Sequence, residues 1–133
     1  MAGVVRRDAV KCGEAQRELM KTHTITLDNP GDCLIWREGM GRTVEIFDIR
    51  VASERRCGRG RELLERLLQI VNPQDDCVRG DRPAVIYAFT RMSNTVAHQF
   101  YEACGFRILG RLHEFYRDGG GVHEAALVYG LDL

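Results

Sequence analysis

Arginines and glycines are concentrated between residues 55 and 61, where the sequence reads Arg-Arg-Cys-Gly-Arg-Gly-Arg. Apolar residues at helical spacing follow, so a helix is predicted to begin inside this stretch. Backbone N–H groups at the start of a helix lack internal partners and attract anions, and glycines admit an anion closely or adopt positive φ. The alternative is a solvated, arginine-rich loop before a surface helix. The candidate residues for a phosphate site are Arg55, Arg56, Cys57, Gly58, Arg59, Gly60 and Arg61.

The spacing of this stretch differs from that of two familiar phosphate loops. A Walker loop has Lys and then Ser or Thr after its last glycine, whereas Gly60 is followed by Arg61 and Glu62. A dinucleotide fingerprint needs a further glycine where Arg56 stands. Both kinds of nucleotide site are therefore disfavoured.

A second stretch with chemical potential spans residues 94–106 and reads Asn-Thr-Val-Ala-His-Gln-Phe-Tyr-Glu-Ala-Cys-Gly-Phe. On a helix, Asn94, Ala97 and Tyr101 lie at i, i+3 and i+7 and so share one face. A phenol has a reference pKa near 10, so it is protonated at neutral pH and can act as a proton donor. The alternative for Tyr101 is packing in the core beside Phe100.

Strands and helices must position these two stretches. Alternating β-branched and aromatic types with glycine-containing turns predict an antiparallel meander over residues 22–27, 33–37 and 43–51. A helix ending near Val71 leads to an apolar strand over 84–90, which should be the parallel neighbour of the third strand. Ser93 is expected to cap the next helix and Gly105 to end it. A final hairpin over 106–116 and 122–133 is predicted, and a weak helical pattern precedes residue 22.

Together the two stretches resemble the GNAT superfamily of N-acetyltransferases. Arg55, Gly58 and Gly60 match its pyrophosphate loop, Q/R-x-x-G-x-G/A, and residues 94–106 match its later motif, N-x-x-A-x-x-F-Y-E-x-x-G-F. The resemblance covers roughly residues 43–107. It implies one α+β domain over the whole chain, with a mixed, mostly antiparallel sheet flanked by helices and two splayed, parallel central strands. The region before residue 22 looks abbreviated, which leaves the acceptor site less defined than the cofactor site.

The resemblance also implies a co-substrate and site residues. Acetyl-CoA would place its pyrophosphate on the arginine–glycine loop and pair its pantetheine arm with the backbone of Ile49, Arg50 and Val51, with Asn94 also holding that arm. Tyr101 would be the general acid.

Glu45 is the candidate general base. Period-two alternation puts it on one strand face with Phe47, Ile49 and Val51, while Asp48 faces the other way. The alternative is that Glu45 is a solvent-facing carboxylate of the strand.

Composition sets the class of protein. Lys+Arg and Asp+Glu both number 19, so no net charge favours nucleic acid or a membrane surface, and no apolar run is long enough to span a bilayer. The five cysteines are scattered without a C-x-x-C, and neither they nor the four histidines have metal-ligand spacing. We therefore expect a cytoplasmic protein with reduced thiols and no metal site.

Three functions remain open from the sequence. The first is an acetyl-CoA-dependent N-acetyltransferase that acts directly on a primary amine of a small molecule or peptide, with a homodimer as the expected assembly. The second is a catalytically silent acyl-CoA-binding module of the same fold that serves as a sensor or subunit. The third is an unrelated small α+β domain whose arginine loop binds a phosphorylated ligand or RNA; the lack of interleaved aromatics and of net positive charge argues against RNA.

Overall fold

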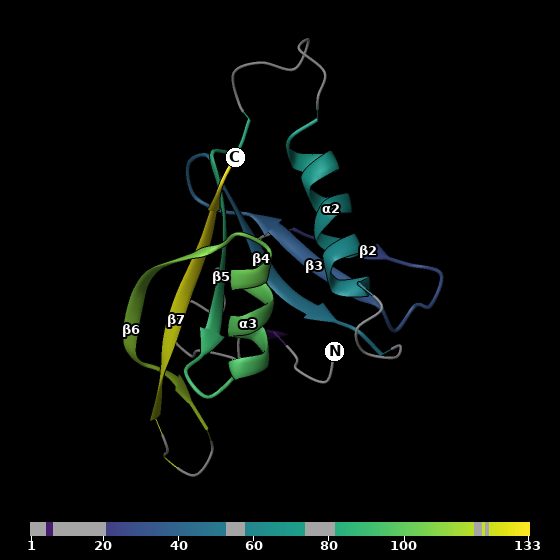
Figure 1. Ribbon diagram of the computed structural model, residues 1–133. Helices are drawn as coiled ribbons and strands as arrows, with labels where there is room; N and C mark the ends of the chain where they lie inside the picture. The colour runs from purple at the N-terminus through teal and green to yellow at the C-terminus, as the bar shows by residue number, and fades with distance from the viewer. Residues whose placement is uncertain (1–4, 7–20, 53–57, 74–81, 119–120, 122) are drawn as a thin grey trace.

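In the part of the chain that the structure describes, a mixed sheet packs with two helices (Figure 1). The computed structural model describes residues 5–6, 21–52, 58–73, 82–118, 121 and 123–133. Within them the elements are β1 (Val5–Arg6), β2 (Thr22–Thr26), β3 (Cys33–Glu38), β4 (Thr43–Arg50), α2 (Arg59–Val71), β5 (Val85–Arg91), α3 (Thr95–Ala103), β6 (Arg107–Arg117) and β7 (His123–Asp132). The predicted helical pattern before residue 22 lies outside the described residues, apart from β1.

The strand order is β2-β3-β4-β5-β7-β6, and β1 pairs with β4. β2, β3 and β4 form the predicted antiparallel meander, and β6 and β7 form the predicted final hairpin. β4 and β5 are the parallel pair, because helix α2 carries the chain from one to the other. The α+β fold expected from the sequence is confirmed.

The parallel pair separates part of the way along. β4 and β5 are paired only from Thr43 opposite Val85 to Ile46 opposite Ala88. Beyond that point β4 continues to Arg50 beside β3, and the backbone of β1 pairs with β4 at Ile49 and Asp48. The two central strands are thus splayed, and β1 lies against the end of β4 that has left β5.

A β-bulge in β4 changes which side chains share a face. Ile35 of β3 pairs with Asp48, whereas the next residue, Trp36, pairs with Ile46, so Phe47 is the extra residue. After the bulge the alternation is shifted by one position. Asp48 therefore lies on the face of Glu45, and the expectation that Glu45 shares its face with Ile49 is wrong.

Both helices pack into one hydrophobic core on the same side of the sheet (Figure 1). Leu63 and Leu67 of α2 and Ala97 and Tyr101 of α3 are fully buried there, as their helical spacing predicts. Trp36 also belongs to this core and stacks on His23, with ring centroids 4.4 Å apart. In the part of the chain that the structure describes, neither the length nor the hydropathy of any helix suffices to cross a membrane.

Candidate functional site

The N-terminus of α2 is an open set of backbone donors. Gly58 is the N-cap and makes no side-chain cap hydrogen bond. Its φ is 71°, so the positive φ that the sequence allows at this glycine is confirmed. The N–H of Glu62 makes the first intrahelical bond, to the carbonyl of Gly58 at 2.9 Å. The three N–H groups before it, on Arg59, Gly60 and Arg61, have no partner inside the helix. Of the predicted loop residues, Arg55, Arg56 and Cys57 lie outside the described residues.

Gly60 serves close packing between the two helices. It lies inside α2 and is not among the glycines with positive φ. A Cβ at Gly60 would lie 2.8 Å from Cε1 of Phe100 on α3. The glycine is therefore required by the close approach of α3 to the first turn of α2.

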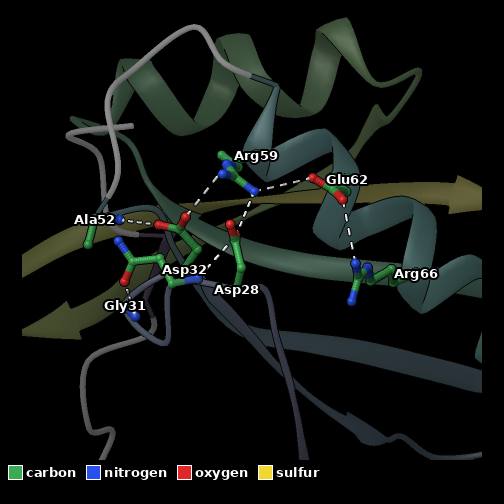
Figure 2. A network of polar contacts seen from close by, with 8 residues as sticks. Asp28, Gly31, Asp32, Ala52, Arg59, Glu62 and Arg66 are labelled. Carbon is green, nitrogen blue, oxygen red and sulfur yellow. Dashed lines mark hydrogen bonds and ion pairs between the residues drawn. The ribbon is translucent and has the colours of Figure 1, made fainter.

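The two described arginines of the loop are held by the protein, and Figure 2 shows the contacts of Arg59. Arg59 donates from Nη1 to Oδ1 of Asp28 at 2.9 Å, and its guanidinium also lies 3.9 Å from Asp32 and 3.7 Å from Glu62. Arg61 donates from Nη2 to the carbonyl of Ala103, in the last turn of α3, at 3.0 Å. Both side chains fix the position of α2. The nearness of the two arginines to the glycines in the sequence does not reveal this role.

Asn94 caps α3. Its Oδ1 accepts from the N–H of Ala97 at 3.1 Å, so the cap is Asn94 and the expectation that Ser93 caps this helix is wrong. Gly105 ends the helix with φ 89°, as expected. Asn94 thereby fixes the end of α3 that leads, two turns on, to Tyr101.

Tyr101 is buried in the core between α3 and β7. Its ring is fully buried, and its centroid lies 4.9 Å from that of Phe106 and 5.7 Å from that of Tyr129. No described residue is a hydrogen-bond partner of its hydroxyl. Burial first, and then the nearby Asp48 carboxylate, raise the pKa of Tyr101 well above the ordinary value of 10.0. The phenol is therefore a protonated donor beside β4.

Glu45 is one half of a buried ion pair. Arg37 on β3 donates to Oε1 of Glu45 from Nε at 3.0 Å and from Nη2 at 2.8 Å, and both side chains are at most 5% exposed. The Arg37 guanidinium also lies 5.0 Å from the centroid of the Phe47 ring. Contrary to the alternative reading of Glu45, its carboxylate does not face solvent. A guanidinium fork stabilises the ionised carboxylate and occupies one of its oxygens.

Asp48 is a carboxylate that alternation alone assigned to the wrong face. It is 3% exposed, accepts from Nε of Arg50 at 2.9 Å and is near enough to Tyr101 to raise its pKa. Only the bulge at Phe47, which depends on the partner strand, brings Asp48 to the face of Glu45.

The backbone of Ile49 is paired on both edges. β3 pairs with it through Leu34, and β1 pairs with it through Val5. A pantetheine arm that pairs with Ile49 would need the edge of β4 that β1 occupies. The two arrangements therefore exclude one another. Val51 follows β4 and is buried in the core, whereas Arg50 is exposed.

The geometry combines a helix start whose first N–H groups have no partner inside the helix, a splayed parallel pair and a buried phenol. Residues 24–106, more than half of the chain, match the model of the acetyltransferase (GNAT) family. The chain belongs to this family of acetyltransferases. The expected class of enzyme, an acyltransferase, is thereby confirmed.

Solved structures with the same fold are similar to this GNAT chain. The protein smu.2055 of Streptococcus mutans superposes with a TM-score of 0.65 at 23% identity, over 93% of this chain and 78% of that one. The ribosomal-protein-S18-alanine N-acetyltransferase of Escherichia coli gives a TM-score of 0.64 at 21% identity, over 90% and 76%. A GNAT acetyltransferase of Elizabethkingia anophelis, solved with acetyl-CoA bound, gives 0.61 at 20%, over 76% and 67%. A search of curated protein sequences gave no match.

Proposed function

We propose that this chain transfers an acetyl group from acetyl-CoA directly to a primary amine of a peptide or small molecule. The observation that carries the proposal is the Tyr101 hydroxyl, which is fully buried and has no hydrogen-bond partner among the described residues. A buried donor without an acceptor is costly, so a ligand that supplies the acceptor is favoured at this position. The sulfur of an acyl thioester becomes such an acceptor when the bond between carbonyl carbon and sulfur breaks and the sulfur leaves as a thiolate.

The chain's residues divide the work. The uncapped N–H groups of α2 bind the pyrophosphate, with the rest of the predicted loop beside them. Asn94 fixes α3 and lies beside the pantetheine arm, which takes the edge of β4 at Ile49. Tyr101 donates its proton, or a strong hydrogen bond, to the departing thiolate.

Glu45 or Asp48 accepts the proton of the amine. Both are on one face of β4, and both are almost fully buried. Glu45 is the residue that the sequence indicates, and Asp48 is favoured by its proximity to Tyr101. Deprotonation through a bound water is compatible with either carboxylate.

A peptide acceptor is supported by the neighbours, since the Escherichia coli protein is an N-acetyltransferase for a ribosomal protein's alanine. The test is a panel of peptides and small amines incubated with acetyl-CoA while the release of free thiol is measured. Amine-dependent release that is lost in the Tyr101→Phe variant supports the proposal. Binding of acetyl-CoA without release for any amine would favour the silent acyl-CoA-binding module.

A homodimer is proposed as the assembly. β6 is an edge strand of the sheet, and it carries the exposed apolar residues Ile108, Leu109 and Leu112. Edge strands with apolar side chains associate readily. Light scattering at micromolar concentration should give twice the 15.1 kDa chain mass, and Leu109→Lys should shift the mass toward the monomer. A wild-type protein that scatters as a monomer would remove this part of the proposal.

A further inference from the structure

The turn between β2 and β3 packs directly on Ala52, which follows β4 and lies shortly before the predicted phosphate loop. A Cβ at Gly31, in this turn, would lie 2.6 Å from the Cβ of Ala52. The turn itself is tightly hydrogen-bonded: the N–H of Leu27 donates to the carbonyl of Asp32 at 3.1 Å, and the N–H of Asp32 donates to the carbonyl of Asn29 at 2.9 Å. The turn is therefore a preorganised platform beside Ala52.

Asp32 extends from this platform toward both ends of the loop (Figure 2). Its Oδ1 accepts from the N–H of Ala52, the last described residue before the loop, at 2.8 Å. Its Oδ2 lies 3.9 Å from Nε of Arg59, the first residue of α2. Asp32 is fully buried, so its charge is screened little by water. One carboxylate thus contacts the residues on either side of segment 53–58.

Asp28 reinforces only one of these two contacts. It accepts from Nη1 of Arg59 at 2.9 Å, but its side chain is 75% exposed. An exposed ion pair contributes little, whereas a hydrogen bond to a buried carboxylate contributes more. The two aspartates therefore form a matched pair in which Asp32 should dominate.

We infer that Asp32 is a positioning residue for the pyrophosphate of acetyl-CoA: it fixes the start of α2 relative to the end of β4 by holding Ala52 and Arg59 at once. This inference rests on the proposed function. Because Asp32 neutralises Arg59 and carries the same sign of charge as a phosphate ligand, it acts by fixing the start of α2 and not by contact with the phosphate. The effect should be confined to ligands that carry the pyrophosphate.

Calorimetry with acetyl-CoA and with S-acetylpantetheine, which lacks the pyrophosphate, tests the inference. Asp32→Ala should weaken acetyl-CoA binding by roughly 10- to 100-fold, the range for a lost hydrogen bond to a charged group, and leave S-acetylpantetheine binding unchanged. Asp32→Asn keeps an acceptor for Ala52 and should recover part of the affinity. The control Asp28→Ala should change acetyl-CoA affinity by less than about threefold.

The outcomes separate the inference from the proposed function. A wild-type protein that binds acetyl-CoA no better than S-acetylpantetheine would overturn both. Normal preference for acetyl-CoA that persists in Asp32→Ala, or an equal loss for both ligands, would overturn the positioning role alone. If Asp32→Ala does not fold, as thermal unfolding will show, Asp32→Asn decides, because loss of only the Arg59 contact should still weaken acetyl-CoA binding selectively.

Discussion

Gly60 on α2 and Phe100 on α3 are in such close contact that a single added carbon at Gly60 would lie 2.8 Å from Cε1 of the ring. The two motifs that indicated the family from the sequence, one around Gly60 and one around Phe100, are therefore joined physically. The start of α2, where the phosphate site is proposed, and the helix of Tyr101 are fixed to one another by this contact.

The Gly60→Ala variant should have opposite effects with and without the Phe100 ring. Overpacking costs about 1–3 kcal/mol, whereas alanine is favoured over glycine in a helix by about 1 kcal/mol. In the wild-type background the substitution should therefore destabilise the protein. In a Phe100→Leu background it should be neutral or stabilising. Urea unfolding of the four proteins measures the coupling, and a coupling energy of zero would contradict the contact.

Tyr101→Phe should reduce turnover without reducing stability. The hydroxyl has no partner among the described residues, so its removal should change the free energy of unfolding by less than about 1 kcal/mol. With an acceptor identified, kcat should fall roughly 10- to 1,000-fold while the affinity for acetyl-CoA stays nearly constant. Full kcat with chemistry rate-limiting would show that Tyr101 only packs in the core.

Glu45→Gln should destabilise the protein by about 3–5 kcal/mol, because it leaves the buried Arg37 without its counter-charge. Urea unfolding measures the loss. Replacing both partners, as in Arg37→Met with Glu45→Leu, should recover most of it, since no buried charge is then left unpaired.

Asp48→Asn is compared with Glu45→Gln to decide which carboxylate is the catalytic base. The pH profile of kcat/KM for the two single variants identifies the base, because only its replacement removes the rise of the profile with pH. A rise that persists in both variants would assign deprotonation to water.

Glu124 should make stability depend on pH below 4.5. It accepts from the N–H of Ser93 at 2.7 Å and from Nη1 of Arg91 at 2.8 Å, and hydrogen bonds from these two residues lower the pKa of Glu124 below its ordinary value of 4.5. A lowered folded-state pKa means that the unfolded chain binds the proton more readily. The stabilisation is therefore complete above pH 4.5 and is lost as the pH falls through the folded-state pKa.

Glu124→Gln checks this dependence. At neutral pH the variant should be less stable by about 1–2 kcal/mol, and the difference from wild type should shrink on acidification. Urea unfolding as a function of pH measures it, with the exposed Glu38→Gln as the control. A difference that is constant across pH would show that the charge of Glu124 is not involved.

Local patterns in the sequence were enough for the fold and for the elements that carry the site. Periodicity located the strands and helices, and glycines marked the start of α2 and the end of α3. The side-chain partners could not be read in this way, because they come from distant parts of the chain: Asp28 and Asp32 for Arg59, and Ala103 for Arg61.

The strand face on which Asp48 lies could not be predicted from local patterns either. Strict alternation places it opposite Glu45, and only the register of β3 against β4 reveals the extra residue at Phe47. Ser93 and Asn94 are both good capping residues in adjacent positions, so propensity alone could not choose between them.

Because β1 pairs with β4, the N-terminal segment is an intramolecular competitor for the edge of this strand. It competes for the backbone edge at Ile49 with any acyl-CoA that binds as proposed, and its effective concentration is set by the chain that links it to β2. The apparent dissociation constant for acetyl-CoA then equals the intrinsic one divided by the fraction of molecules in which the edge is open. Whatever draws the segment away from β4 would tighten cofactor binding without altering any contact to the cofactor.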